Sequence, residues 1–394
     1  MRETKKIYKK IICPFFVVCM VFTNAQSATQ QKEVDNAALF YYQALLLWPK
    51  PDSNDKVTFL VLDEVAKGAD PNESVKKYLN LPESRVTIEL VQEAAQIPLC
   101  DWGPLYPGGY GHGVLAPSLQ RFSRFMQVYA HNLAAEGDFR SAFENCIGIQ
   151  RFAGHIGGET FLMFAVSRMV NGRALTSIRL VLGSVPPDVE TLTWLKGHLV
   201  PSNVLPSRII KILRSNCNLH LLFMHDHPKA YLPWWEEYPE AIEDPNAKKK
   251  ILECANKLYN KHLESTLKIL ESDLPYAGKK AELQKLINKI EYKADSNDCS
   301  IILGDCIPYI ESCYNIMVRD VANFNALTVA LEIYLINART GQIPEILPDN
   351  QAKDPFSDED FEYKVTDEGF ALRYRDDSPW KKSRWIDFKV KVKR

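Results

Sequence analysis

The chain has 394 residues, enough for two or three domains or for one elongated helical domain. Hydrophobic residues make up 46% and charged residues 25%, so the composition excludes a disordered chain. The formal net charge of −1 gives no general attraction to nucleic acid, and we expect no nucleic-acid partner.

The first 28 residues have the three parts of a secretory signal peptide. A basic stretch, MRETKKIYKK, is followed by the apolar run IICPFFVVCMVF and then by the small and polar residues TNAQSA. The apolar run is too short to span a bilayer comfortably. We therefore predict export to the periplasm or out of the cell, with cleavage after Ala25, Ser27 or Ala28. An uncleaved membrane anchor is the alternative, and no later stretch reads as a membrane span.

Cleavage would remove five Lys or Arg residues and one Glu, leaving 43 basic and 48 acidic residues and a net charge of −5. Export permits disulfides, but an odd number of cysteines in a long chain is not typical of a disulfide-rich scaffold. We expect most cysteines to be small core residues, and the sequence does not give a pairing. The mature chain contains Cys100, Cys146, Cys217, Cys254, Cys299, Cys306 and Cys313.

Residues 29–340 are predicted to form one mainly α-helical domain of stacked antiparallel hairpins. Apolar residues recur there every three or four positions, which is the period of a helix face. Helices are predicted between Asp35 and Pro49 and over residues 57–67, 72–80, 84–97, 159–182, 188–199, 206–225 and 306–339, with helical hairpins over 116–158 and 246–294.

Capping residues and helix breakers set the expected boundaries. Asp35 is expected to cap the first helix, and Gly137 with Asp138 to form the turn of the first hairpin. Pro82 is expected to separate two helices, and Pro275 with Gly278 to mark the bend of the second hairpin. The apolar side of the first helix is predicted to consist of Ala38, Tyr41, Tyr42, Leu45 and Leu46.

After Gly341 the period of the apolar residues changes to two. Phe361, Tyr363 and Val365 alternate with polar residues, and the same alternation recurs from Phe370 and again from Ile386. This pattern predicts a C-terminal β element over residues 341–394, with a small antiparallel sheet of three strands.

The stretch CDWGPLYPGGYGHG, residues 100–113, is the most unusual segment of the chain. A dinucleotide fingerprint needs a strand before its glycines, whereas a helix is predicted here, and no Walker-type Gly-Lys-Ser/Thr occurs. One interpretation is a ligand cleft whose aromatic rings stack on a sugar or a peptide group. The other is a loop that only folds over the helices. The cleft residues would be Asp101, Trp102, Tyr106, Tyr110 and His112.

Cys217, His220, His225 and His227 form the best metal candidate, and zinc accepts such ligands. Cys217 and His220 share a helix face because they are three residues apart. The spacing matches none of the usual zinc frameworks, and the alternative is a helix end with histidines near its C-terminal dipole. No other cofactor motif is present.

Common catalytic motifs are absent from the sequence. It contains no Gly-x-Ser-x-Gly elbow, no His-Glu-x-x-His pair and no Glu-x-x-His. Residues that are distant in sequence can still form a nucleophile–base pair, so an unrecognised hydrolase or metalloenzyme stays a third hypothesis.

Three passages resemble a family of exported, mostly helical bacterial proteins that is common in planctomycetes and their relatives. They are NAALFYYQALLL, then CDWG with LAAEGDFRSAFENCIGIQRFAGHIG, and GQIPEIL with DPFSDEDFEYKVTDEGFALRY. The family usually has Gly after Asp-Pro-Phe-Ser, where Asp358 stands here, and often a Gly- and Asp-rich tail, which a basic strand replaces. The turn Ala-Glu-Gly-Asp also resembles tetratricopeptide hairpins, but no 34-residue period is found. No activity is established for the family, so the resemblance implies architecture and export.

The sequence therefore supports two main hypotheses of function. The first is a structural or interaction protein of the cell envelope, whose helical array binds a protein or an envelope polymer. The second is a protein that binds a small molecule or a glycan through residues 100–113. A deep pocket containing Trp102, Tyr110 and His112 would favour the second, and a smooth open groove with no pocket would favour the first.

Overall fold

The structure, a computed structural model, describes residues 35–51, 57–103, 111–157, 160–186, 188–202, 205–226, 244–291, 299, 309–349, 351–375 and 385–391. For residues 111–114 and 290–291 only the backbone is described. The signal peptide predicted over residues 1–28 lies outside these ranges.

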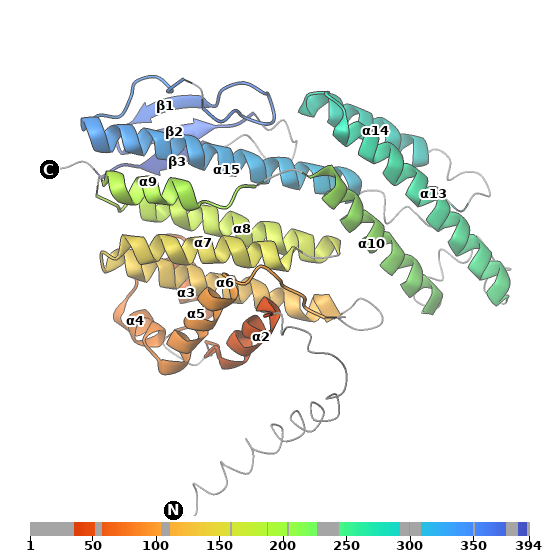
Figure 1. Ribbon diagram of the computed structural model, residues 1–394, viewed down its shortest axis with the longest axis horizontal. Coiled ribbons are helices and arrows are strands. Elements are labelled where there is room, and N and C mark those ends of the chain that lie inside the picture. Colours follow the sequence, from red (N-terminus) through yellow and green to blue (C-terminus); the bar gives the residue numbers. More distant parts are fainter. Residues whose placement is uncertain are drawn as a thin grey trace, which may run out of the picture.

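The chain forms a layered helical body with a small sheet on one side and a group of three helices at one end (Figure 1). The short N-terminal helices are α2 (Ala37–Leu47), α3 (Phe59–Ala66), α4 (Glu73–Leu79) and α5 (Pro82–Ala94). The central layers are α6 (Gly111–Ala135), α7 (Phe139–Ile156), α8 (Phe161–Leu182), α9 (Val189–His198) and α15 (Tyr309–Thr340). The end group is α10 (Pro206–Asp226), α13 (Pro245–Glu271) and α14 (Tyr276–Glu291). The predicted mainly α-helical array of antiparallel hairpins is confirmed.

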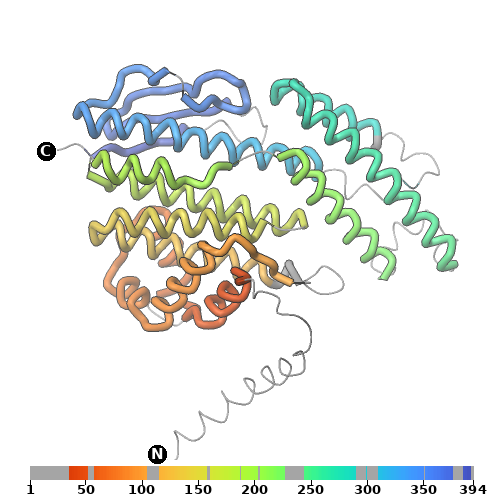
Figure 2. The backbone as a smooth tube through the Cα atoms, viewed as in Figure 1, coloured from red at the N-terminus to blue at the C-terminus, as the bar shows by residue number. Residues whose placement is uncertain are grey.

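The first hairpin forms as its turn residues predicted. Gly137 has φ of 87°, a left-handed conformation that suits glycine, and the Asp138 side chain accepts a hydrogen bond from the Ser141 N–H at 3.1 Å. The apolar faces of α6 and α7 then pack on each other and on α8. The backbone trace shows α8 lying between this hairpin and α15, with α13 and α14 inclined away from the body (Figure 2).

Several predicted boundaries were wrong at the N-terminal side. Asn36, rather than Asp35, caps α2 by accepting a hydrogen bond from the Ala38 N–H at 3.1 Å. Pro82 separates α4 from α5 as predicted, and it is itself the first residue of α5, because a first-turn residue needs no N–H donor. Leu46 is 85% exposed, because Ala44 and Leu45 face the core in its place.

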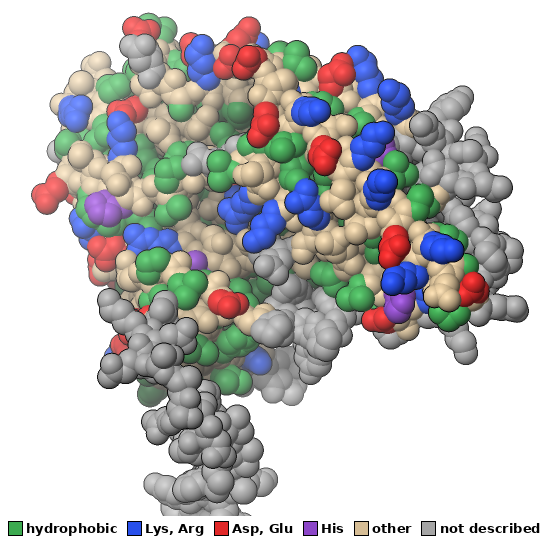
Figure 3. All heavy atoms as spheres, turned by 45° about the vertical axis from the view of Figure 1, so that its right-hand side comes forward, with side chains coloured by type: hydrophobic (Ala, Val, Ile, Leu, Met, Phe, Trp, Pro, Cys, Tyr) green, Lys and Arg blue, Asp and Glu red, His purple; other side chains and the backbone are tan. Residues whose placement is uncertain are grey.

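Two further boundaries differ for reasons of helix length. Helix α6 begins at Gly111, so the loop predicted over residues 100–113 is shorter than expected. Gly278 lies inside α14, which begins at Tyr276 directly after Pro275. The α13–α14 hairpin carries charged side chains of both signs over its outer surface, as its sequence predicted (Figure 3).

Helix α15 corrects the expectation that no later stretch resembles a membrane span. Within the described part of the chain, it is the one helix whose length and composition would suit a membrane crossing. In the structure, 56% of its most apolar window is buried, and the helix contacts α8 and α9. A helix in the core of a protein meets the same criteria. Packing against the neighbouring helices therefore explains the hydrophobicity of α15.

The C-terminal sheet has the three predicted strands, β1 (Glu362–Thr366), β2 (Gly369–Arg373) and β3 (Ile386–Lys389), with β2 in the middle. Both pairings are antiparallel, and Phe370 lies opposite Phe388 with their rings stacked at 5.1 Å. Gly369 has φ of 153°, and a Cβ there would lie 2.1 Å from the Phe388 carbonyl oxygen. Only glycine fits at this point of the β1–β2 turn.

The Asp-Pro-Phe-Ser passage organises the segment before the sheet. The Asp354 side chain is 1% exposed and accepts hydrogen bonds from the Phe356 N–H, the Ser357 hydroxyl and the Arg375 N–H at 2.8–3.0 Å. Asp358 has φ of 61°, the conformation that glycine adopts most easily and that Asp tolerates. This backbone conformation therefore explains why the family that the chain resembles usually has glycine at this position.

The cysteines divide into buried thiols and one disulfide. Cys146, Cys217 and Cys313 are buried, as predicted for core residues, while Cys306 lies outside the described residues. Cys299 is instead disulfide-bonded to Cys254 on α13. This disulfide connects the segment after α14 to α13. The sequence alone does not predict the pairing.

Buried polar groups on α8 are paired across the layers. Arg168 and Asp320 on α15 form an ion pair at 2.7 Å, and Asp320 also accepts a hydrogen bond from Asn171 at 2.9 Å. The Asp320 side chain is only 5% exposed. Removing one partner of such a pair leaves an uncompensated charge in the interior.

We expect Asp320→Ala to lower the free energy of unfolding by about 3–5 kcal/mol, because Arg168 stays buried without its counterion. Urea denaturation followed by circular dichroism measures the change. As the control, Glu253→Ala breaks the exposed Lys249–Glu253 pair on α13 and should cost about 1 kcal/mol or less. Equal effects of the two substitutions would contradict the assignment of Arg168–Asp320 as a buried pair.

Candidate functional site

A cavity of about 640 Å³ lies where the segment after α5 meets the end of α7 and the start of α10. Its volume is within the range of small-molecule sites. The side chains that matter chemically in its wall are Asp101, Trp102, His155, Arg208 and Lys211. The cavity thus combines two residues of the predicted cleft with three from other elements.

The segment that carries Asp101 is attached to the start of α2 by the amide of Asn36. The Asn36 Nδ2 donates to the Asp101 carbonyl oxygen at 2.7 Å, and the Asn36 Oδ1 accepts from the Asp101 N–H at 2.9 Å. The Ala37 N–H also donates to the Leu99 carbonyl oxygen at 2.9 Å. These bonds fix the backbone of residues 99–101 at the cavity wall.

Trp102 is held on three sides. Its indole N–H donates to the His155 carbonyl oxygen at 2.8 Å, which ties the segment to the last turn of α7. One face stacks on Tyr41 at 5.6 Å between ring centroids, and Tyr42 approaches edge-on. The Tyr42 hydroxyl donates to the Trp102 carbonyl oxygen at 3.2 Å. Trp102 is therefore a fixed part of the wall, with its only polar donor already used.

The Asp101 carboxylate is partly engaged by its own segment. Its Oδ1 accepts a hydrogen bond from the Gly103 N–H at 2.9 Å, which makes an Asx turn. Gly103 has φ of 74°, so glycine suits the turn. The side chain is exposed and can still accept further hydrogen bonds at the cavity edge.

His155 lies in the last turn of α7 and is partly buried. Its Nδ1 is 2.9 Å from the Tyr41 hydroxyl. Burial, assisted by the nearby charge of Arg151, lowers the pKa of His155 below its ordinary value of 6.5. Burial also raises the pKa of Tyr41, so both groups are neutral at pH 7. A neutral imidazole adds hydrogen-bonding capacity to the wall without adding charge.

Arg208 brings a partly buried positive charge to the cavity from the first turn of α10. Its Nη2 donates to the Gly157 carbonyl oxygen at 3.1 Å, just beyond the end of α7. Burial and the charge of Arg168 lower the pKa of Arg208, whereas Asp320 raises it. Gly157 makes room for this arrangement, because a Cβ there would lie 2.2 Å from the Arg208 Nη2.

Cys100 also lines the cavity, but its thiol is not an activated nucleophile. Burial, with a smaller contribution from the charge of Asp101, raises the pKa of Cys100 to about 12. A catalytic cysteine needs a lowered pKa so that the thiolate forms near neutral pH. Cys100 therefore gives no support to the hydrolase hypothesis.

The structure brings together only part of the predicted cleft. Asp101 and Trp102 line the cavity, Tyr106 and Tyr110 lie outside the described residues, and only the backbone of His112 is described, in the first turn of α6. No motif in the sequence marks His155, Arg208 or Lys211 as site residues. The three-residue spacing of Arg208 and Lys211 places them on one helix face, but nothing in the sequence indicates which segment that face meets.

The predicted zinc ligands are not assembled in the part that is described. Cys217 is fully buried in the apolar cluster between α10 and α13, while His225 lies at the exposed end of α10 and contacts Asp226 at 2.9 Å. Cys217 and His225 are eight positions apart, which corresponds to about 12 Å along the helix axis. His220 lies on the same helix, and His227 is outside the described residues. No three potential metal ligands cluster anywhere among the residues with described positions.

Comparison with protein families, with characterised proteins and with solved structures finds no match. The resemblance to the planctomycete family therefore stays a prediction, and function has to be argued from the site. The passages that carry the resemblance contact one another here. Asn36 and Tyr41 of the first passage hold Asp101 and Trp102 of the second, so packing explains why these residue types occur together.

We expect acid to destabilise the fold through His155. Its pKa is lowered in the folded state, so the unfolded chain binds more protons as the pH falls below about 6.5. The contribution of the neutral His155 to the free energy of unfolding is complete above pH 6.5. It is lost as the pH falls toward the pKa of His155 in the folded state. Urea denaturation at pH 7 and pH 5 should show a smaller acid effect in His155→Asn than in the native protein.

The control for this measurement is His198→Asn, which removes an exposed histidine at the end of α9. This variant should keep the acid response of the native protein. An unchanged acid response in His155→Asn would show that protonation of His155 is not coupled to folding.

Proposed function

We propose that the protein binds a small anionic molecule in the cavity beside Trp102 and does so outside the cytoplasm. The observation that carries this proposal is the guanidinium of Arg208, partly buried at the cavity wall and held by the Gly157 carbonyl oxygen. An arginine with further donors beside a cavity can bind a carboxylate, sulfate or phosphate through two parallel hydrogen bonds.

The charges in the wall support an anion rather than a neutral ligand. Arg208 and Lys211 contribute two positive charges, and Asp101 contributes one negative charge. His155 is neutral, and the nearby Arg168 is neutralised by Asp320. Cationic side chains therefore outnumber carboxylates among the described lining residues, in a partly buried place where charge interactions are stronger than in water.

The shape of the wall supports a ligand with a ring. Trp102 gives a rigid aromatic surface at the cavity, and His155 adds a hydrogen-bonding group beside it. Such a combination suits a sugar ring, whose C–H face packs on an indole while its hydroxyls bond to polar groups. An acidic monosaccharide combines the ring with the negative charge.

The cavity supports the binding hypothesis in part, because Trp102 of the three expected residues lines it, whereas Tyr110 and the side chain of His112 lie outside the described part of the chain. A structural or interaction role in the envelope, with a protein or polymer partner, stays a prediction. The described residues supply no nucleophile or metal cluster at this site that would favour an enzyme.

We expect D-glucuronate to bind measurably and D-glucose, its neutral counterpart, to bind at least tenfold more weakly. Arg208→Gln should weaken glucuronate binding about 10- to 100-fold, because a hydrogen bond to a charged group contributes about 1.5–3 kcal/mol. Isothermal titration calorimetry measures both differences. Gly157→Ala is a second variant, because the added methyl group displaces the Arg208 guanidinium without removing its charge.

Arg214→Gln is the matched control, since Arg214 lies on the same helix but is exposed and contacts Asn260. It should leave binding unchanged. Equal binding of glucose and glucuronate would contradict the role of charge. Failure of glucuronate, acetate, sulfate and phosphate alike to bind the native protein would contradict the proposed site.

Export rests on the predicted signal peptide and is supported by the Cys254–Cys299 disulfide, a bond typical of oxidising compartments. Expression in a bacterial host with an intact secretion system should give a periplasmic form that begins at residue 26, 28 or 29. N-terminal sequencing identifies the cleavage site. A chain that keeps residues 1–28 would instead support the membrane-anchor alternative.

A further inference from the structure

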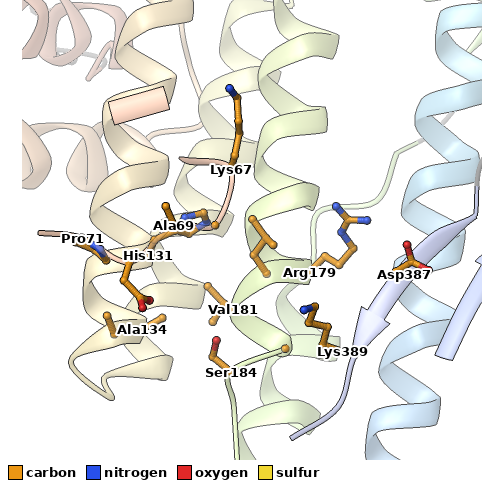
Figure 4. Close-up of a pocket in the computed structure, with 15 residues that line it drawn as sticks. Lys67, Ala69, Pro71, His131, Ala134, Arg179, Val181, Ser184, Asp387 and Lys389 are labelled. Carbon is orange, nitrogen blue, oxygen red and sulfur yellow. The ribbon is translucent and has the colours of Figure 1, made fainter. Parts of the chain in front are cut away.

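A second cavity, of about 440 Å³, lies on the other side of the body, at the carboxyl end of α8 (Figure 4). Its wall comes from four separate parts of the chain, which are the segment between α3 and α4, the last turn of α6, the last turn of α8 and strand β3. None of its lining residues belongs to the cavity beside Trp102.

Arg179 and Asp387 give this cavity opposite charges on facing elements. Arg179 comes from α8 and Asp387 from β3, and both side chains are seen in the wall (Figure 4). Asp387 attracts the Arg179 guanidinium, but among the residues that the structure describes no carboxylate lies close enough to form an ion pair with it. The partly buried guanidinium therefore keeps its hydrogen-bond donors available.

Three helices end at this cavity. Lys67–Pro71 follow α3, Ala134 and Ala135 are the last residues of α6, and Val181–Ser184 cover the end of α8. The carboxyl end of a helix carries partial negative charge. The wall also contains two lysines, but Lys67 is paired with Glu64 and Lys389 with Glu368, each at 2.8 Å. Asp70 and Asp387 with the helix ends can therefore attract a positive group beside the guanidinium that attracts a negative group.

A buried histidine in the wall supplies an additional acceptor. His131 is 8% exposed, and its Nδ1 lies 2.7 Å from the Val65 carbonyl oxygen. Burial lowers the pKa of His131, so the ring is neutral and its Nδ1–H is the donor to that oxygen. The buried Nε2 is then an acceptor with no hydrogen-bond partner among the described residues. Such unpaired groups are uncommon in protein interiors.

We propose that this cavity is a second binding site, selective for a free α-amino acid in its zwitterionic form. The carboxylate binds the Arg179 guanidinium, and the ammonium group faces Asp387 and the helix carboxyl ends. His131 is the only aromatic residue in the described wall, so the surface on which sugars commonly pack is small. The site goes beyond the proposed function, because it uses different residues and a different ligand class.

The test is isothermal titration calorimetry of the full mature chain against a panel of free L-amino acids. Propionate and ethylamine serve as single-charge analogues of alanine, because each lacks one of its two charged groups. We expect at least one amino acid to bind, and alanine to bind at least tenfold more tightly than either analogue. Arg179→Gln and Asp387→Asn should each weaken amino-acid binding at least tenfold.

Arg179→Lys keeps the positive charge but lacks the planar guanidinium, which can donate two parallel hydrogen bonds to a carboxylate. This variant therefore tests whether the carboxylate is bound through that geometry or through charge alone. Arg214→Gln, on the surface of α10, is the control for loss of an arginine and should leave amino-acid binding unchanged. The titrations are repeated in the Arg208→Gln background, which weakens anion binding beside Trp102, so that the difference between alanine and propionate reports on the second cavity. Propionate binding as tightly as alanine would overturn the zwitterion site in favour of a plain anion site. Absence of binding by every amino acid, or equal binding by the Asp387→Asn variant, would also overturn it.

Discussion

The burial of α8 between the α6–α7 hairpin and α15 is the constraint on which the rest of the structure depends. A helix enclosed on several sides has to pair its polar groups inside the protein, and Arg168 does so with Asp320 of α15 across the layer boundary. Two cavities lie at the two ends of this helix. Met163 near its start lines one cavity, and Arg179 near its end lines the other.

The two cavities differ because different kinds of element meet at each end of α8. At its start, the segment that carries Trp102 meets Arg208 and Lys211 in the first turns of α10. Hydrogen bonds made by Asn36 and by the Trp102 indole hold this segment in place. At its end, three helix carboxyl ends and strand β3 surround Arg179. Helix α8 has 22 residues, so the ends lie roughly 33 Å apart and the sites cannot share one small ligand.

Trp102, the one aromatic residue of the predicted cleft whose side chain the structure describes, has mainly a packing role. Trp102 uses its indole N–H and one ring face to hold the segment against α2 and α7, which leaves it a fixed surface for a ligand. In the proposed site, the charge that would select a ligand comes from Arg208, which the sequence places only within a predicted helix. Rigid aromatic walls with a few polar groups in place are the usual construction of a small-molecule site.

The sequence by itself determined the helices, the first hairpin turn at Gly137 and Asp138, and the alternating strands, because these depend on local periodicity and capping. It also marked Asp101 and Trp102 as unusual. Only the tertiary structure decided that Arg208 meets them, that Cys254 bonds Cys299 and that α15 is a core helix, because these depend on which faces of distant segments come together. The period of a helix says which residues share a face, but the packing of the layers determines what that face contacts.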